Sequence, residues 1–425
     1  MTPTTAGAGA PALRTARGMN LVAGLVGAAV LLGLGAWVVV ASVQQDFAAY
    51  YTAGRARALG LDPYVNHVEG PWDGLAIYRH SRFLYPPLLA ELFRPLAALP
   101  FAWAKALYTG FSVAALLTAL RIAGASADPR PRTFGLTALA VAAWPPVFLA
   151  VERGQIDLLL LPLLAVAWRM RSQRIALGGA CLALCALAKP PVLAVLPVAM
   201  LVTGRRAVGL TAATLAGVGL LLGAGALLSG AALSRRYVTE VLPRAALYGE
   251  GGPEDWLLAA SRFDDAANDL ESGIARVGGR TYALGLGELR RNASLPRWLT
   301  PEEDAPPSWL SLVIFVALGG GLAVMARQRP EAPEWFWGAL LVGVLAAPVS
   351  WAMSLTWALP LLQAWFARAG SSGSARALRV GTATTFALGF LGLATPAAWV
   401  LAGLAAVTTA ALVSRMPAEP RETVS

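Results

Sequence analysis

Residues 19–41 have the sequence MNLVAGLVGAAVLLGLGAWVVVA, which contains no charged side chain. A helix needs roughly 20 apolar residues to cross the hydrocarbon core of a bilayer, so this run is long enough to span a membrane. Arg14 and Arg17 precede it, as basic residues do at the start of a signal peptide. The run is far longer than the roughly 7–15 residues of a signal peptide's apolar region, so we expect it to remain as an anchor.

Similar apolar segments recur along the whole chain of 425 residues, of which 57% are hydrophobic and 14% are charged. Soluble proteins carry roughly 25% charged residues, so this composition indicates a protein that lies largely in lipid. We predict an all-α integral membrane protein, a bundle of about twelve transmembrane helices in a single polytopic domain. The domain covers residues 19–414, and its segments are 19–41, 100–121, 134–150, 156–168, 175–188, 190–203, 207–229, 309–326, 335–349, 351–367, 378–394 and 397–414.

The arginines predict the orientation of the chain. With the N-terminus in the cytoplasm, the arginine-rich connections all fall inside, whereas the short outer connections contain only Arg153 and Lys189. We therefore expect cytoplasmic tails at about 1–18 and 415–425, and two long extracytoplasmic loops at about 42–98 and 230–308. The inner arginines are Arg121, Arg130, Arg132, Arg169, Arg171, Arg174, Arg205, Arg206, Arg327, Arg329, Arg368, Arg376, Arg379 and Arg415. They form no continuous stripe, so the net charge of +10 favours membrane orientation over nucleic-acid binding.

Other composition signals are weaker. Arginine outnumbers lysine 32 to 2, which is typical of a GC-rich bacterial genome and favours the cell (inner) membrane as the location. Cys181 and Cys185 lie in one apolar segment and are interpreted as small buried hydrophobic residues. His67 and His80 are the only histidines and lack the spacing of metal ligands. The chain contains no phosphate-binding glycine loop and no metalloprotease motif.

The first outer loop begins with a carboxylate beside two tyrosines, in the stretch DFAAYY at 46–51. If the helix continues there, Asp46 and Tyr50 share a face, with Tyr51 next to them. A carboxylate just above a membrane can accept a proton from a sugar hydroxyl. The alternative is an interfacial aspartate followed by an ordinary aromatic belt. The loop also contains Tyr85, in FLYPPL at 83–88.

Two further outer turns contain charged residues. The stretch ERGQID at 152–157 places three charges and an amide at the start of an apolar run, where they are costly unless paired or facing a cavity. The alternative is a Glu152–Arg153 pair that caps a span. Lys189 ends the segment 175–188 directly before two prolines, on the side that the positive-inside rule disfavours. It is a candidate anion-binding residue, and a snorkelling lysine at a helix C-terminus is the alternative.

Two later stretches complete the pattern on the outer side, NASL at 292–295 in the second loop and PVSW at 348–351 between two spans. Taken in order, these stretches resemble the polyprenol-phosphate-sugar-dependent glycosyltransferases of family 87, which have the GT-C membrane fold. The matching pieces are Asp46-Phe47, Tyr50-Tyr51, Gly60 to Tyr64, Tyr85-Pro86-Pro87, Gly154-Gln155, Lys189-Pro190, Asn292 to Leu295 and Ser350-Trp351. Each piece is weak alone, and their order and common side make the resemblance fairly specific.

The chain also departs from the family's pattern. Members commonly have asparagine where this chain has Asp157, and they often have a histidine where it has Ala352-Met353-Ser354. The second loop carries an insertion around 249–288.

The resemblance implies a GT-C-type bundle that transfers a hexose, often mannose, from a polyprenyl-phosphate sugar to a hydroxyl of a lipid or glycan acceptor. It assigns the general base to Asp46 and implies no metal and no cofactor. We expect the transfer to occur at the outer face with inversion, and Lys189, with Arg82 or Arg153, to stabilise the departing phosphate. The expected substrate contacts are Tyr50, Tyr51, Tyr85, Glu152, Gln155, Asp157, Asn292, Ser294, Ser350 and Trp351.

The alternative function is transport, by a flippase of lipid-linked glycans. Transporters often contain internal repeats and place charged residues at the bilayer midplane. This sequence shows no repeat, and its charged residues lie at the ends of the apolar segments.

Overall fold

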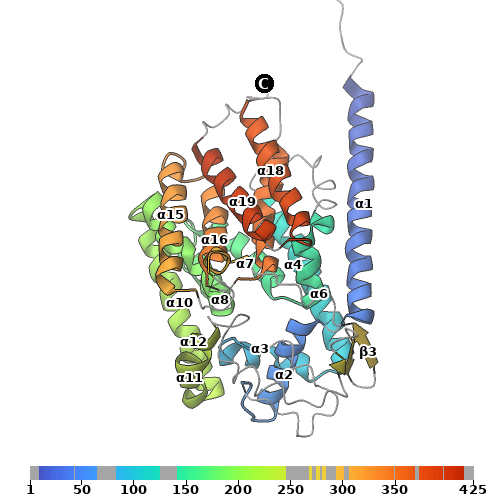
Figure 1. The fold of residues 1–425 in the computed structure, drawn as a ribbon, viewed down its shortest axis with the longest axis vertical. Coiled ribbons are helices and arrows are strands. Elements are labelled where there is room, and N and C mark those ends of the chain that lie inside the picture. The colour runs from blue at the N-terminus through green and yellow to red at the C-terminus, as the bar shows by residue number, and fades with distance from the viewer. Residues whose placement is uncertain are drawn as a thin grey trace, which may run out of the picture.

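The computed structural model describes residues 9–42, 44–64, 83–124, 141–245, 268–269, 274–277, 280–283, 293–300, 306–348, 350–368, 373–395 and 397–415. Nearly all of these residues are helical, and the helices form one bundle with the long helix α1 at its edge (Figure 1). The helices are α1 (Gly9–Ala41), α2 (Gln45–Ala58), α3 (Pro87–Ala97), α4 (Phe101–Gly124), α6 (Pro145–Arg153), α7 (Asp157–Met170), α8 (Ile175–Ala188), α9 (Val195–Thr203), α10 (Arg206–Ser229), α11 (Ala231–Arg236), α12 (Leu242–Ala245), α14 (Leu295–Trp298), α15 (Ser308–Ala326), α16 (Glu334–Ala346), α17 (Leu359–Arg368), α18 (Gly373–Leu391) and α19 (Ala397–Arg415).

Three short helical turns and a small sheet complete the described elements. Two 3-10 turns, η2 (Pro190–Ala194) and η5 (Ala352–Ala358), lead into α9 and α17, and the π-helical turn η3 (Tyr237–Val241) joins α11 to α12. Strands β1 (Asn268–Asp269), β2 (Ile274–Val277) and β3 (Arg280–Ala283) form an antiparallel sheet in the order β1-β2-β3. This sheet, in the second predicted outer loop, is an addition to the helical architecture expected from the apolar segments.

Each of the twelve predicted apolar segments coincides wholly or partly with a described helix, but the helices differ greatly in length. Among the described residues, five helical stretches are long and apolar enough to cross a membrane. They are Leu21–Ala41, Phe101–Ala123, Arg206–Ser229, Ser308–Ala326 and Ala397–Arg415. The number of spans therefore stays a prediction, whereas the helical membrane architecture agrees with expectation.

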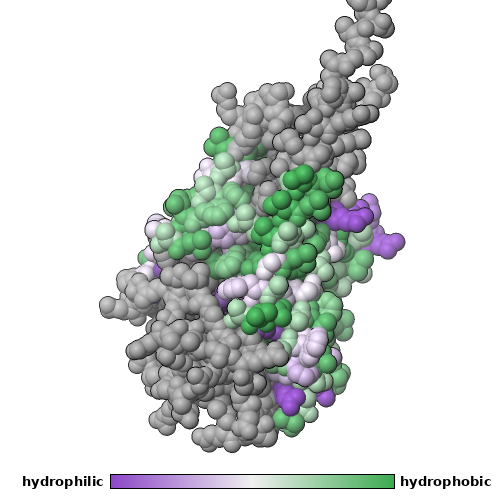
Figure 2. Space-filling view, turned by 90° about the vertical axis from the view of Figure 1, so that its right-hand side faces the viewer, coloured by the Kyte–Doolittle hydropathy of each residue, from purple (hydrophilic) through white to green (hydrophobic). Residues whose placement is uncertain are grey.

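The outer surface of these helices is apolar, as contact with lipid requires. In α1, Leu32 and Val40 are 70% and 74% exposed, and in α10 Leu227 is 89% exposed. Figure 2 shows hydrophobic residues covering most of the coloured part of one face, with hydrophilic residues in small patches. Such exposure would favour aggregation of a soluble protein and is ordinary in a bilayer.

Proline limits several of the inner helices. Helix α6 begins at Pro145-Pro146, α8 ends just before Lys189-Pro190, and α16 ends just before Pro348. A proline lacks the N–H that the preceding turn would need, and it disfavours helical geometry at the residue before it. As a result α6 to α9 contain only 9 to 14 residues each, and polar groups at their ends come close to the bundle interior. Helix α16 is the most enclosed, with all 13 of its residues buried.

The predicted outer loop at 42–98 is largely helical where it is described. It contains α2 and α3, which pack on one another below the bundle in Figure 1, near α11 and α12. The buried residues of α2 include Phe47, Tyr50 and Tyr51. The sequence predicted a long connection here, and its described part consists mainly of these two helices.

The arginine-rich connections gather at the other end of the bundle. Arg171 of the α7–α8 connection pairs with Glu331 at 2.5 Å, and Arg327 donates to the carbonyl of Leu201 at 2.9 Å. Arg329 donates to the carbonyl of Val413 near the end of α19. Connections that the sequence predicts to be cytoplasmic thus contact one another, although they are far apart along the chain.

Candidate functional site

A strained turn before α2 positions the first candidate residue. Gln44 is the only non-glycine residue with a positive φ, 53°, among those described, and α2 starts directly after it. Non-glycine residues adopt this conformation when surrounding contacts enforce it. Here Ser42 Oγ donates to the Glu152 carbonyl at 3.0 Å, and Gln44 Nε2 donates to the Val151 carbonyl at 2.8 Å. The turn is therefore held against the end of α6, and Asp46 follows in the first turn of α2.

A buried lysine supports this turn from a third element. Lys105 lies in α4 with 0% exposure, and its Nζ donates to the Ser42 carbonyl at 2.6 Å. One helical turn farther along, Thr109 Oγ1 donates to Gln44 Oε1 at 3.3 Å. Sequence reasoning did not select Lys105, although a lysine inside an apolar segment is costly and therefore a signal of function or structure.

Glycine allows α6 and α2 to approach closely. Gly154 ends α6 in the left-handed region, with φ 69°. A Cβ at this position would lie 2.6 Å from Phe47 Cβ and 3.2 Å from Gln44 Cβ, so there is no room for a side chain. The residues on either side, Arg153 and Gln155, are consequently brought against Asp46.

The Asp46 carboxylate accepts hydrogen bonds from both of these neighbours. Arg153 Nε donates to Oδ2 at 2.9 Å, and Arg153 Nη2 lies 3.4 Å from Oδ1. Gln155 Nε2 donates to Oδ2 at 2.6 Å. Asp46 is 6% exposed and Gln155 is 4% exposed, so these interactions are largely shielded from water.

The contacts continue from Gln155 to a second ion pair. Lys189 Nζ donates to Gln155 Oε1 at 3.3 Å and lies 3.1 Å from Asp157 Oδ2. Asp157 is fully buried, and Ser354 Oγ donates to its Oδ1 at 2.8 Å. These contacts join α2, α6, α7, η5 and the end of α8. We call the set Asp46, Arg153, Gln155, Asp157, Lys189 and Ser354 the charged network.

The charged network is electrically balanced. It contains two carboxylates and two cations, and each carboxylate has one cation in direct contact. The side chains of Arg153 and Lys189 are each 13% exposed. Burial of charge is expensive unless it is paired, so the pairing explains how these residues persist at the end of an apolar bundle.

Two tyrosines extend from the charged network toward α3. The hydroxyls of Tyr50 and Tyr85 are 3.0 Å apart, and Tyr64 donates to the Tyr85 carbonyl at 2.7 Å. Burial raises the pKa of Tyr50 well above its usual value, and the neighbouring Tyr85, Tyr108 and Asp46 raise it further. Burial likewise raises the pKa of Tyr85. Both tyrosines therefore keep their protons at neutral pH and can donate hydrogen bonds.

Several other predicted site residues make contacts within the fold. Tyr51 donates to the carbonyl of Leu99 at 2.7 Å and packs edge-on against Phe101 at the start of α4. Its hydroxyl is thus engaged with the backbone of the connection between α3 and α4. Glu152 is 2% exposed at the end of α6, and its carbonyl accepts the bond from Ser42.

The second predicted outer loop contacts the break between α16 and η5 directly. Ser294 Oγ donates to the carbonyl of Ala347 at 2.5 Å and caps α14 by accepting from the N–H of Arg297. The N–H of Ala293 donates to the Ser350 carbonyl at 2.6 Å. Trp351 is half-buried and packs on the core at the start of η5. Arg82 and Asn292 lie outside the described residues.

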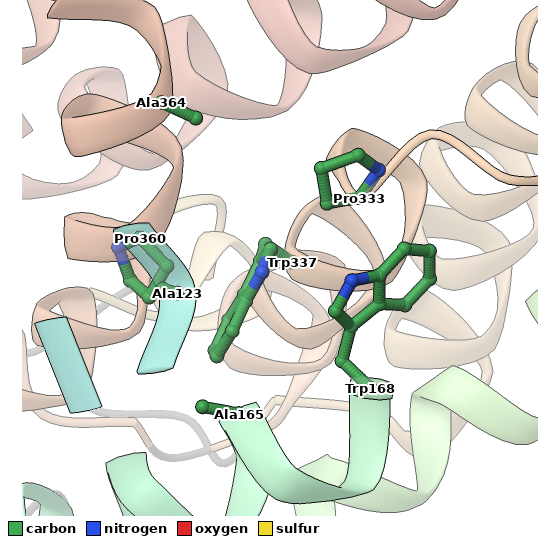
Figure 3. Close-up of a pocket in the computed structure, with 7 residues that line it drawn as sticks. All are labelled: Ala123, Ala165, Trp168, Pro333, Trp337, Pro360 and Ala364. Carbon is green, nitrogen blue, oxygen red and sulfur yellow. The ribbon is translucent and has the colours of Figure 1, made fainter. Parts of the chain in front are cut away.

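A small apolar pocket lies at the other, arginine-rich end of the bundle, between α4, α7, α16 and α17 (Figure 3). Its lining contains Trp168 and Trp337, which face one another across the pocket, together with Ala123, Ala165, Pro333, Pro360 and Ala364. The Arg171 guanidinium lies 3.3 Å from the centre of the Trp168 ring. Without an ionisable lining residue this pocket offers no acid–base chemistry, so the charged network is the better candidate site.

The fold and the charged network together define a helical membrane protein with a polar site at one end of its bundle. The sequence model of glycosyltransferase family 87 matches residues 83–354, well over half of the chain. The chain therefore belongs to glycosyltransferase family 87 and is a membrane glycosyltransferase. The match includes the whole charged network except Asp46, which precedes it. Searches of curated proteins and of solved structures found no match.

Proposed function

We propose that the protein transfers a hexose, with mannose as the expected sugar, from a polyprenyl-phosphate donor to an acceptor hydroxyl at the extracytoplasmic face. The contact of the Asp46 carboxylate with Arg153 and Gln155, and through Gln155 with Lys189, is the observation that supports this proposal. A carboxylate for the acceptor proton and cations for the donor phosphate lie side by side, as a single-displacement transfer requires.

In this reaction Asp46 is the general base. It takes the proton from the acceptor hydroxyl as the oxygen attacks the anomeric carbon, and the bond from that carbon to the phosphate oxygen breaks. One displacement by one nucleophile inverts the configuration at the anomeric carbon. The retaining route of glycosidases would instead need a second carboxylate acting as a nucleophile.

Lys189 and Arg153 stabilise the negative charge that develops on the departing phosphate. Each has a side chain that is only 13% exposed, where a cation acts more strongly on a nearby anion than it would in water. Tyr50 and Tyr85, which keep their hydroxyl protons, donate hydrogen bonds to the sugar or the phosphate. We also assign Asn292, as the family resemblance suggests, to the same outer site, and Arg82 as a further cation for the donor phosphate.

We infer the chemical class of the donor from the position of the charged network at the end of the apolar helices. Nucleotide sugars are polar and are made in the cytoplasm, and no Rossmann-type βαβ pattern interrupts the apolar segments to bind one. A donor on a long isoprenoid reaches the protein through the bilayer, with its phosphate near the membrane surface. Lys189, at the end of an apolar helix, suits that delivery.

Purified enzyme in lipid should transfer hexose from a polyprenyl-phosphate hexose without added divalent metal. Lys189→Ala should raise the KM for the donor more than the KM for the acceptor, because the cation acts on the phosphate. Initial rates with each substrate varied in turn measure both effects. Efficient transfer from a soluble nucleotide sugar, without a lipid donor, would exclude this function.

A further inference from the structure

Both cations that the proposed function assigns to the donor phosphate are already engaged by carboxylates. Arg153 Nε lies 2.9 Å from Asp46 Oδ2, and Lys189 Nζ lies 3.1 Å from Asp157 Oδ2. A phosphate that approached these cations would therefore compete with Asp46 and Asp157. The base and the phosphate site are held together by the same contacts.

The position of Asp46 in this arrangement is unfavourable for a base. Arg153 Nε and Gln155 Nε2 both contact Oδ2, and Arg153 Nη2 contacts Oδ1 at 3.4 Å, so both carboxylate oxygens accept from the charged network. An oxygen that accepts two short hydrogen bonds is a poor acceptor for a further proton, because hydrogen bonds to the charged form favour that form. The acceptor hydroxyl needs a carboxylate oxygen with an available lone pair.

We propose that the donor phosphate exchanges places with the two carboxylates, so that donor binding itself releases Asp46 as a base. This inference rests on the proposed function and adds an order to it, donor first and acceptor second. Arg153 moves from Asp46 to the phosphate, and Lys189 moves from Asp157 to the phosphate. Asp157 is fully buried and holds Lys189 in place until the donor arrives. After the exchange it keeps its hydrogen bond from Ser354, and the attraction of Lys189 to the phosphate must exceed the cost of separating this ion pair.

The net charge of the network changes little during this exchange. Two carboxylates and two cations balance before the donor binds, and the phosphodiester adds one negative charge. Asp46 then takes the acceptor proton as the phosphate leaves with a second negative charge. Because Asp46 takes up a proton as the phosphate gains a charge, the net charge of the network and the bound phosphate does not change during the transfer.

Gln155 couples the two halves of the exchange. Its Nε2 contacts Asp46, and its Oε1 contacts Lys189, so one amide touches the base and one of the cations. Withdrawal of Lys189 toward a phosphate removes the partner of Oε1 and frees the amide to rotate away from Asp46. The Gln155 side chain therefore links the movement of Lys189 toward a phosphate to the release of Asp46.

The test measures equilibrium binding of a long-chain polyprenyl phosphate to purified enzyme in nanodiscs, with the matching polyprenol as the reference ligand. If the carboxylates compete with the phosphate, then Asp46→Asn and Asp157→Asn should each tighten polyprenyl phosphate binding by at least about tenfold, or about 1.4 kcal/mol. Polyprenol binding should not change. Thermal unfolding establishes that each variant is folded, and the two variants test the exchange independently.

Glu91→Gln is the matched control, because Glu91 is also a carboxylate held by two arginines, Arg57 at 2.8 Å and Arg94 at 2.9 Å. It makes these contacts outside the charged network, so its loss should leave phosphate binding unchanged. Unchanged or weaker binding in either folded aspartate variant would overturn the exchange. If the wild type instead binds the phosphate no better than the polyprenol, the proposed donor class itself is wrong.

Discussion

At the scale of single residues, the position of the Asp46 carboxylate depends on residues around it. Its carboxylate is positioned by a backbone turn that Ser42, Gln44 and Lys105 hold in place through bonds to α6 and α4. A catalytic group is effective when its geometry is set before the substrate arrives. If Asp46 is the base, as we propose, Ser42, Gln44 and Lys105 are positioning residues, which affect the reaction through the geometry of Asp46.

The first prediction concerns the base. Asp46→Asn keeps the size of the side chain and removes the proton acceptor, and general bases contribute typically about 10²–10⁴-fold to rate. We expect the turnover number to fall by about that factor, with normal expression and membrane insertion. Initial rates at saturating donor and acceptor measure it.

Asp62→Asn supplies the comparison for this prediction. Asp62 is likewise a carboxylate beside an arginine at the same end of the bundle, but its partner is Arg236 and it lies outside the charged network. Its variant should retain most of the activity. Near-normal turnover of the Asp46 variant would mean that the base lies elsewhere, with Glu152 and Asp157 as the next candidates.

Sequence reasoning identified most members of the charged network but none of the pairings. Five members are polar or charged residues next to apolar runs, where placing them near the membrane costs free energy and therefore draws attention in the sequence. They are Asp46, Arg153, Gln155, Asp157 and Lys189. Which carboxylate meets which cation depends on how α2, α6 and α8 pack, over more than 100 residues of separation for Asp46 and Gln155. The role of Ser354 as a donor to Asp157 was likewise invisible, because a serine carries no such cost.

At the scale of helices, length and breaks decide where the polar residues lie. The apolar segments predicted the positions of the helices well, because burial in lipid or protein demands long runs of apolar side chains. Helix α3 was not predicted, and α2 was considered only as a continuation of the first apolar helix, since α2 contains tyrosines, arginines and glycine in place of a simple apolar stripe. Its burial results from tertiary packing against α3 and the bundle.

The second prediction tests the close approach of α6 to α2. In Gly154→Ala the added Cβ would lie 2.6 Å from Phe47 Cβ, and the left-handed backbone at this position is unfavourable for alanine. We expect lower thermal stability and a large loss of activity, because Arg153 and Gln155 would move away from Asp46. Thermal unfolding in detergent and initial rates measure these effects.

Gly60→Ala separates the two causes of the loss expected in Gly154→Ala, which are the contact with Phe47 and the strain of the left-handed backbone. Gly60 has a similar positive φ, 73°, but a Cβ there would meet no atom within 4 Å. Its variant bears the backbone strain alone, of about 1–3 kcal/mol. Equal losses in the two variants would show that strain, and not the contact with Phe47, limits the residue at position 154.

At the scale of the whole molecule, the two ends of the bundle differ in chemistry. One end holds the charged network, α2 and α3, and the other holds the arginines that contact Glu331, Leu201 and Val413. This separation is what the positive-inside rule leads us to expect if the arginine end is cytoplasmic.

The third prediction assigns the two ends to the two sides of the membrane. Single cysteines that replace the exposed Leu59 and Trp298, each 53% exposed, should react with an impermeant thiol reagent in intact cells. Cysteines that replace Arg174 and Arg206 should react only after the cells are opened. The native Cys181 and Cys185 are buried and should stay unreactive. The reverse pattern of labelling would place the charged network in the cytoplasm.

The shortness of α7 and α8 has a consequence for the surrounding lipid. Each contains 14 residues and therefore rises about 21 Å, whereas the hydrocarbon core of a bilayer is about 30 Å thick. Asp157 begins α7 and Lys189 follows α8, so the charged network lies only that distance from the connection at 171–174. Most of α7 is buried in the bundle, and the 24-residue helices α4 and α10 pack against α7 and α8, so these long helices meet the full bilayer thickness. We therefore expect the polyprenyl phosphate to descend below the level of the neighbouring headgroups to reach the charged network. Turnover should then rise in bilayers of shorter acyl chains, which shorten that descent, and equal turnover across chain lengths would contradict it.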